Sequence, residues 1–389
     1  MKKSNRAIGF LVVSLVLGLS VVPSLHARAE VDPPKTLALS LDEAKELALK
    51  QNPSVELADL KFKRARIAAD KMQRVADGVS KAESALDHWP EGVPVPAEFT
   101  AINTYDTQTL KVLKNQAALA VTWAEKGARL AREGLKMAVE KAYYDVIKSD
   151  ENLKAAQDGL ARASQLKAQA EQAVNAGTAS KSDLLAAGVQ LASAQTALSM
   201  AQKGQEIALM TLNKTLGNDL NRPLKLTTGL TYEPVDPVNV EAKIAQALEK
   251  RLEMAQARGN LEIKRLTLEL AKKYYTPNVD VYKNDELDVR EAEIALDQKT
   301  QDVTLEVRQA YVALTGAEER VGVAAKGLDL ARESFRLANV RYQAGVTTSY
   351  EVTAAQAALS QAEAQSIQAL YDYNLAKGVF RNATAEGLD

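Results

Sequence analysis

The sequence predicts an all-α protein built from two tandem repeats of a long coiled-coil hairpin, with little or no β-structure. Three observations predict this fold. Proline is absent from two stretches of more than a hundred residues each, the two stretches match one another at a fixed shift, and apolar residues recur every seven positions within them. These features indicate long helices that pack along seams.

Residues 1–29 have the pattern of a secretory signal peptide. Lys2, Lys3 and Arg6 precede an apolar stretch over residues 7–22, and the triplet at 27–29, Ala-Arg-Ala, provides a small-residue cleavage site before Glu30. An uncleaved N-terminal anchor is the alternative, although the apolar stretch is shorter than the ~20 residues that span a bilayer as a helix. We expect an exported protein.

Composition excludes several classes of function. Four of the 49 Lys and Arg residues and none of the 50 Asp and Glu residues lie in 1–29, so the exported chain has a net charge of −5, and we expect no nucleic acid as a ligand. The chain has no cysteine, and its two histidines are His26, inside the signal peptide, and His88. Because the exported chain has neither a second histidine nor a glycine-rich phosphate loop nor a nucleophile motif, we expect no enzyme, no cofactor and no metal site.

Proline placement defines the helical stretches. No proline lies between Pro96 and Pro223 or after Pro277, and the intervening residues are rich in Ala, Leu, Gln, Glu, Lys and Arg. A helix from about Asp106 to Asn175 would be roughly 100 Å long at ~1.5 Å per residue. Because a compact domain is narrower than this, we expect a rod.

The two stretches are copies of one unit. Laying the pair Ala142-Tyr143 on Ala310-Tyr311 also lays Ala176-Gly177 on Ala344-Gly345, because the two pairs share one shift (310 − 142 = 344 − 176 = 168). An internal repeat of this kind predicts a repeated supersecondary unit.

The domain boundaries follow from this repeat and from a weaker one. Residues 48–52 correspond to residues 247–251 at a shift of 199, so the first copy is longer by the difference between the two shifts (199 − 168 = 31), which includes a proline-rich insertion at about 88–106. Residues 217–239, with two glycines and three prolines, form a connector. We therefore expect a first repeat over 30–216 and a second repeat over 240–389.

A heptad pattern runs along the long helix of the second copy. Large residues at 314, 321, 328, 335 and 342 form one seam beside alanines at 310, 317, 324, 331 and 338, a pattern that allows two helices to approach closely. Val323, Leu330 and Leu337 add a second apolar face. A helix with two seams needs two neighbours, which either an isolated antiparallel bundle or an oligomeric helical tube provides.

Each long helix ends at a matching turn. Residues 175–184 read NAGTASKSDL and residues 343–352 read QAGVTTSYEV. The glycine ends one helix, Ser and Thr residues cap the next, and Asp183 and Glu351 fall in its first turn, where a carboxylate interacts favourably with the helix dipole. Turn chemistry alone explains these residues, and two similar turns at one end of a rod would in addition form a docking surface.

These patterns resemble the outer membrane efflux protein (TolC-like) family over nearly the entire exported chain. The opening pattern of the family is similar to residues 39–44, LSLDEA, followed by residues 48–53, ALKQNP. Its hairpin pattern occurs twice, first as Ala176-Gly177 with residues 183–185, DLL, and then as residues 341–345, RYQAG, with Glu351-Val352.

The resemblance implies a homotrimer in which each chain contributes two coiled-coil hairpins to a helical barrel that acts as a passive conduit. It also implies that the hairpin tips dock onto a periplasmic adaptor (membrane fusion protein) and through it onto an inner-membrane pump. Carried over residue by residue, adaptor docking falls on Gly177, Thr178, Asp183, Leu184, Gly345, Val346, Glu351 and Val352.

The sequence departs from the family where membrane β-strands are expected. In the second copy only residues 276–284 are free, whereas one membrane-spanning strand needs ~9–11 residues and a strand pair needs twice that number. The first-copy insertion contains three prolines and lacks the alternation of a lipid-facing strand. We therefore expect most or all of these strands to be missing.

Two other kinds of protein are alternatives to a conduit. A coiled-coil spacer or tether of the envelope would keep the hairpins without forming a channel. An adaptor protein would also contain helical hairpins, but its β-rich modules need more strand-like runs than this sequence has.

Overall fold

The computed structural model describes residues 36–90, 93–94 and 107–386. In chain order its elements are β1 (Leu37–Leu39), α1 (Leu41–Gln51), α2 (Pro53–Asp87), α4 (Thr107–Asn175), α5 (Lys181–Leu216), β2 (Leu224–Leu226), α6 (Val240–Lys250), α7 (Leu252–Tyr274), α8 (Asp280–Gln343) and α9 (Ser349–Ala383). The predicted all-α class is confirmed for this part of the chain, in which β1 and β2 are the only strands. The predicted signal peptide, 1–29, lies outside the described residues.

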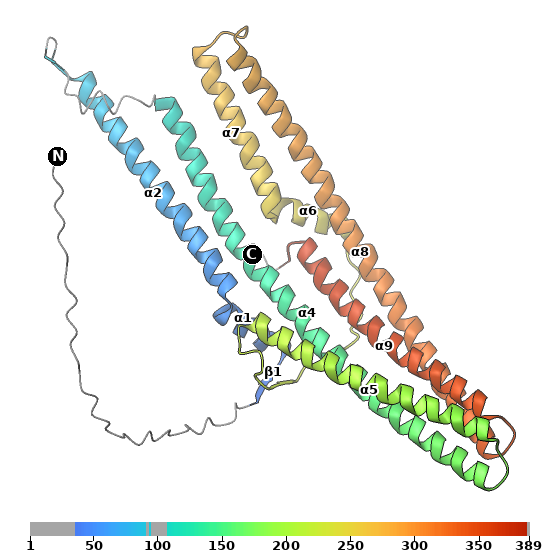
Figure 1. The fold of residues 1–389 in the computed structure, drawn as a ribbon. Coiled ribbons are helices and arrows are strands. Elements are labelled where there is room, and N and C mark those ends of the chain that lie inside the picture. The colour runs from blue at the N-terminus through green and yellow to red at the C-terminus, as the bar shows by residue number, and fades with distance from the viewer. Residues whose placement is uncertain (1–35, 91–92, 95–106, 387–389) are drawn as a thin grey trace, which may run out of the picture. The chain divides into compact units, whose positions relative to one another are not determined.

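Two long helices organise the fold. The first half of α4 packs against α2 and its second half against α5 (Figure 1). In the same way, the first half of α8 packs against α7 and its second half against α9. Ion pairs mark the N-terminal halves, where Arg132 on α4 contacts Asp59 on α2 at 2.5 Å and Lys264 on α7 contacts Asp288 on α8 at 2.6 Å. The α4/α5 and α8/α9 hairpins lie beside one another through contacts between α4 and α9.

Two apolar cores lie near the middle of the long helices, one in each half of the chain. The first core forms where β1, α1, α4 and α5 meet, and the second where α6, α7, α8 and α9 meet. Fully buried tyrosines occupy both: Tyr143 in the first and Tyr373 in the second. In the first core, the strands β1 and β2 pair in parallel, with Leu37 opposite Leu224.

These tyrosines hold the connector between the repeats. The Tyr143 hydroxyl donates a hydrogen bond to the Leu39 carbonyl (3.0 Å) and accepts one from the Thr228 amide (3.0 Å), so it joins β1 to the connector. The Tyr373 hydroxyl donates to the carbonyl of Glu233 further along the connector. Because buried hydroxyls require partners, these bonds fix the connector against α4 and α9.

A buried carboxylate joins three helices at the same level. Glu140 on α4 is 6% exposed and contacts Lys45 on α1 at 3.0 Å and Arg381 on α9 at 2.6 Å. A Cβ added at Gly378 would lie 3.4 Å from a Glu140 carboxylate oxygen, so glycine leaves room for this group. The three charges tie the second hairpin to the first.

The link between α7 and α8 is shorter than expected. α7 ends at Tyr274 and α8 begins at Asp280, so residues 280–284, which the sequence analysis left free, form the first turns of α8. Residues 276–284 therefore contain no strand. Of the predicted insertion at 88–106, residues 91–92 and 95–106 lie outside the described residues.

We expect Glu140→Ala to lower the free energy of unfolding by roughly 2–4 kcal/mol, because it leaves the partly buried Lys45 and Arg381 without their shared counter-charge. Urea unfolding followed by far-UV circular dichroism measures this difference. Glu125→Ala is the matched control, since Glu125 pairs with Arg129 on the surface at i,i+4 and should cost less than about 0.5 kcal/mol. Equal effects of the two substitutions would contradict the role given to Glu140.

Candidate docking tips and subunit edges

The first hairpin turn, between α4 and α5, is closed by its own backbone and side chains. Gly177 has a positive φ of 75°, and the Thr178 amide and hydroxyl both donate to the Ala173 carbonyl, at 2.8 and 3.0 Å. Ser180 and Asp183 form a capping box at the start of α5. Because glycine adopts this backbone conformation without strain, it ends α4 and lets α5 begin four residues later.

The second turn, between α8 and α9, shares the backbone but not the cap. Gly345 has a φ of 70°, and the Val346 amide donates to the Arg341 carbonyl at 2.9 Å, as in the first turn. Thr348 occupies the N-cap position of α9 without a side-chain cap hydrogen bond. The second turn is therefore less completely closed by its own residues.

A hydrogen bond connects the two turns. The Ser349 hydroxyl donates to an Asp183 carboxylate oxygen at 2.7 Å, and Asp183 also accepts bonds from the amide and hydroxyl of Ser180. These bonds, first that from Ser349 and then those from Ser180, hold the pKa of Asp183 below its usual value. Burial, together with the nearby Asp183 charge, raises the pKa of Tyr342. The two tips thus form one polar junction.

The predicted docking residues lie together at this junction, with different exposures. Gly177, Thr178, Gly345 and Glu351 are exposed, and Val346 is 72% exposed. Asp183 and Leu184 are half-buried. Val352 is fully buried, so its side chain packs inside the tip and does not face a partner. Tyr350, which the sequence analysis did not select, is 78% exposed and lies in the first turn of α9, four residues after Val346.

Polar contacts continue along the interface between the hairpins. Arg162 on α4 pairs with Glu363 on α9 at 3.0 Å, with both side chains mostly buried. The Gln356 side-chain amide donates to the Gly159 carbonyl at 3.3 Å and is also buried. The apolar seams therefore hold each hairpin together, whereas hydrogen bonds and an ion pair contribute to the contact between hairpins.

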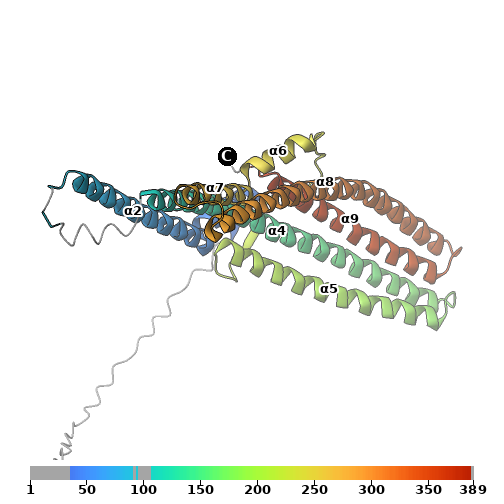
Figure 2. The same ribbon diagram turned by 90° about the horizontal axis from the view of Figure 1, so that it is seen from above.

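The hairpins form a layer with two free edges. α4 contacts α5 and α9, and α9 contacts α8, so the order across the layer is α5, α4, α9, α8 (Figure 2). The α8 edge exposes the second seam found in the sequence: Val323 is 73% exposed, Leu330 74% and Leu337 46%. The second neighbour that this seam requires is not supplied by the described residues of the chain.

The opposite edge, on α5, is also apolar. Leu185, Val189, Met200 and Ile207 are between 61% and 72% exposed. By length and composition α5 is apolar enough to cross a membrane, and only 6% of its most apolar 18-residue window is buried. Because α5 is one arm of an antiparallel hairpin whose other arm is strongly charged, we interpret its apolar face as a helix-packing surface.

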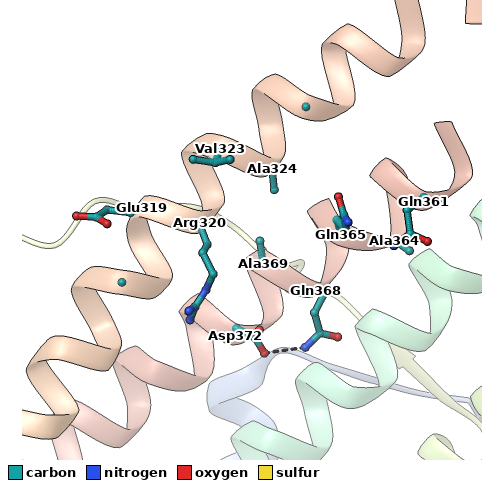
Figure 3. Close-up of a pocket in the computed structure, with 12 residues that line it drawn as sticks. Glu319, Arg320, Val323, Ala324, Gln361, Ala364, Gln365, Gln368, Ala369 and Asp372 are labelled. Atoms are coloured by element: carbon teal, nitrogen blue, oxygen red, sulfur yellow. Dashed lines mark hydrogen bonds between the residues drawn. The ribbon is translucent and has the colours of Figure 1, made fainter. Parts of the chain in front are cut away.

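An open groove of about 730 Å³ lies between α8 and α9 beside the α8 edge (Figure 3). Small residues from both helices line it, among them Gly316, Ala324 and Ala364, with Val323 on the α8 side. The floor includes a hydrogen bond from the Gln368 amide to the Asp372 carboxylate at 2.7 Å. Small residues of this kind allow another helix to approach closely.

The family model described as outer membrane efflux protein matches residues 105–218 and 282–384, which is more than half of the chain. The first matched segment contains the complete α4/α5 hairpin, and the second contains nearly all of the α8/α9 hairpin. The chain belongs to the outer membrane efflux protein family. The resemblance inferred from the repeated turn pattern is therefore confirmed.

Solved structures show the same fold at low sequence identity. A membrane protein from Pseudomonas aeruginosa has a TM-score of 0.71 at 17% identity, with 88% of this chain and 90% of that chain covered. The outer membrane protein VceC from Vibrio cholerae has a TM-score of 0.70 at 14% identity, with 90% and 97% covered, and the CmeC outer membrane channel of Campylobacter jejuni has 0.67 at 15%, with 89% and 86% covered. The comparison with curated proteins found no match.

Sequence reasoning found the turns but missed Ser349 as the residue that connects them. We expect Ser349→Ala to broaden the distribution of distances between the two tips, because it removes the hydrogen bond to Asp183. Double electron–electron resonance between spin labels at Thr178→Cys and Val346→Cys measures this distribution, and the absence of native cysteine keeps the labelling specific.

The same contact should be insensitive to mild acidity. The folded-state pKa of Asp183 lies below its ordinary value of 3.8. The stabilisation that the ionised carboxylate gives to the junction is therefore complete above pH 3.8, and it is lost only as the pH falls through the lower, folded-state pKa. The distance distribution should therefore be identical at pH 7 and pH 5. An unchanged distribution in Ser349→Ala would contradict the proposed link.

Proposed function

We propose that three copies of this chain join edge to edge into a helical tube that serves as the passive conduit of a tripartite export pump in the cell envelope. The observation that carries the proposal is the pair of uncovered apolar edges on opposite sides of one layer, on α5 and α8. Two different edges that fit one another form a heterologous contact, and repetition of such a contact closes a ring when the rotation from one copy to the next adds up to a full turn. Membership of the efflux family supports an export role.

The placement of apolar residues along the two edges supports a match between them. The distance along α5 from its start at Lys181 to Met200 is nearly equal to the distance along α8 from Val323 to its end at Gln343. Val189 and Leu337 likewise lie about two turns from these helix ends. Since the hydrogen bond between the turns sets both tips at one level, residues at equal distance along antiparallel helices would meet between neighbouring copies.

The double variant Met200→Cys, Val323→Cys should therefore form disulfides between copies when purified and oxidised. We expect a ladder on a non-reducing gel that ends at three copies, since the third disulfide closes the ring. Val323→Cys alone is the matched control and should not extend beyond two copies. A double variant that stays a single copy would favour the spacer or tether, and a ladder without an end would contradict closure.

The tips are proposed to dock onto a periplasmic adaptor, and through it onto an inner-membrane pump that supplies the energy. Gly177, Thr178, Gly345, Val346 and Glu351 support this role by their exposure, while Asp183 and Leu184 shape the junction between the turns. Val352 contributes packing only. The chain itself is proposed to do no chemistry, because a conduit requires only a polar path.

Single cysteines test this role in cells. Thr178→Cys and Val346→Cys, each crosslinked in intact cells, should both capture a coiled-coil pump adaptor, identified by mass spectrometry. Asn278→Cys, in the link between α7 and α8, is the control and should capture none. Capture of only wall or surface components from both tips would overturn adaptor docking and leave the spacer hypothesis.

A further inference from the structure

The part of the layer away from the hairpin turns has its own pair of apolar edges. There α4 contacts α2 on one side and α7 on the other, and α7 contacts α8, so the order is α2, α4, α7, α8 (Figure 1). The two outer helices carry large apolar side chains that are between 38% and 66% exposed: Leu57, Ile67 and Val75 on α2, and Leu287, Ile294 and Leu305 on α8. We call these two surfaces the α2 edge and the distal α8 edge.

The two sets of apolar residues have matching spacings if the helices run antiparallel. From Leu57 towards Val75 the steps along α2 are 10 and then 8 residues. From Leu305 back to Leu287 the steps along α8 are 11 and then 7 residues. A difference of one residue corresponds to about 1.5 Å of helix. Three apolar side chains of one edge would therefore meet three of the other, with Ile67 opposite Ile294 in the middle.

Contacts within the chain place Ile67 at the level of Trp123 on α4. Asp59 on α2 pairs with Arg132 on α4 at 2.5 Å. The two helices are antiparallel, since residues further along α2 cluster with Leu110, near the start of α4. Nine residues before Arg132, at Trp123, α2 has therefore reached about residue 68.

The contacts of α7 place Ile294 at the same level. Gly259 on α7 lies against Trp123, since a Cβ there would come within 2.9 Å of a carbon of the indole ring. Lys264 on α7 pairs with Asp288 on α8 at 2.6 Å. Five residues before Lys264, at Gly259, the antiparallel α8 has reached about residue 293. Copies that stand side by side with their hairpin turns at one level would thus bring the two isoleucines together.

The α2 edge is strongly basic. Residues 61–74 contain six Lys and Arg residues and one acidic residue, Asp70, so this stretch has a net charge of +5. The six basic side chains are all exposed, and none forms an ion pair with a described residue of the chain: Lys61, Lys63, Arg64, Arg66, Lys71 and Arg74. Because these like charges repel one another, an acidic surface would be attracted to this edge.

The distal α8 edge has acidic residues that are available for such a contact. Glu291 and Asp297 are exposed and form no ion pair within the described part of the chain. Arg290, the one basic residue between 286 and 297, pairs with Glu293 at 3.2 Å and so does not neutralise them. Both carboxylates lie three residues from Ile294, on its side of the helix.

The antiparallel register brings opposite charges together. With the two isoleucines paired, Arg64 falls opposite Asp297, and Lys71 falls within one residue of Glu291. Each of the four lies three or four residues from the isoleucine of its own helix, and residues at these spacings share one face. An apolar contact with an ion pair on each side is complementary in both spacing and charge, which fixes the register of an interface.

A second copy of the chain fits these observations better than another partner does. A polyanion would be attracted by the basic residues, but it would not match the spacing of the apolar ones. The α8 edge is also continuous, since it extends through Val312, which is 68% exposed, to Val323, where α5 of the neighbouring copy is proposed to pack. One α8 helix would therefore contact first α2 and then α5 of the same neighbour.

We propose that α2 of one copy docks antiparallel on α8 of the next through an ionic clasp, with Arg64 on Asp297 and Lys71 on Glu291 around the two isoleucines. Because salt screens exposed ion pairs, ionic strength controls the closing of this half of the tube. The apolar contact of α5 with α8 does not share this dependence. The inference rests on the proposed edge-to-edge assembly, to which it adds a contact of different chemistry and a means of regulation.

The double variant Ile67→Cys, Ile294→Cys tests the register in the purified full chain, which has no native cysteine. We expect disulfides between copies that form about tenfold more slowly at roughly 1 M NaCl than at roughly 0.05 M NaCl. The variant Met200→Cys, Val323→Cys is the matched control, because its apolar contact should crosslink equally at both salt concentrations.

Charge reversal tests the ion pairs themselves. In the chain with cysteines at 67 and 294, Arg64→Glu with Lys71→Glu should slow crosslinking by about tenfold at low salt, because like charges then face one another. Adding Asp297→Lys and Glu291→Lys should restore the rate, since the pairs form again with exchanged signs. Circular dichroism checks that each variant keeps its helices.

The two cysteine pairs separate failure of the clasp from failure of the tube. Crosslinking at Met200 and Val323 but not at Ile67 and Ile294 would overturn the clasp alone. So would a rate at the isoleucine positions that ignores salt, or a reversed chain that the exchanged charges do not rescue, since the basic residues would then bind a different anion. Failure of both pairs would overturn the proposed assembly and the clasp with it. Salt dependence and charge rescue at the isoleucine positions, beside a salt-insensitive control, support the proposal.

Discussion

The unbroken length of α4 and α8 is the constraint on which the rest of the structure depends. α4 has 69 residues and α8 has 64 residues, so no single partner of ordinary length covers either helix. Two partners placed end to end do so, α2 and α5 on one helix, α7 and α9 on the other. Burial along these seams stabilises helices that are far too long for one compact core, and the seams extend as far as proline is absent. The apolar edges on α5 and α8 are the surfaces left exposed after the described helices of the chain have packed against α4 and α8.

A change of partner halfway along a helix creates a weak point, and the buried polar groups lie there. Tyr143 and Glu140 lie on α4 where that helix exchanges neighbours, and Tyr373 lies on α9 in the second core, where α8 does so. Each bonds to a segment distant in sequence. An apolar core would fill the same space without specifying which segments meet. Hydrogen bonds and charges that must all be satisfied favour one arrangement of the connector over the others. Nearer the hairpin turns, alanine seams hold each hairpin together, and the Arg162–Glu363 ion pair and the Gln356 hydrogen bond contribute to the contact between hairpins.

Sequence alone predicted what depends on periodicity and local turn chemistry. α4 begins one residue from the expected position and ends where expected, at Asn175, and both turns have the predicted glycine at positive φ. The second seam on α8 was likewise recognised, because it repeats every seven residues. The bond between Ser349 and Asp183 was not, since it joins residues far apart in sequence and requires the hairpins to be placed first. The burial of Val352 and the early start of α8 were missed for a related reason: short apolar runs do not distinguish a strand or a surface from a packed helix end.

The two repeats differ most where they touch, and this difference bears on docking. The first turn caps α5 with its own Ser180 and Asp183, whereas α9 has no side-chain cap, and the hydroxyl of its first residue, Ser349, is bonded to Asp183. One carboxylate therefore serves both helix starts. A partner that displaces either tip must break a bond that also orders the other, so the two turns respond as one surface. In a ring of three chains this gives three equivalent surfaces of two tips each, and an adaptor would recognise the pair, not the single turn. The proposed conduit thus presents its partner with two similar hairpin tips from each chain, and this pair occurs three times around the tube.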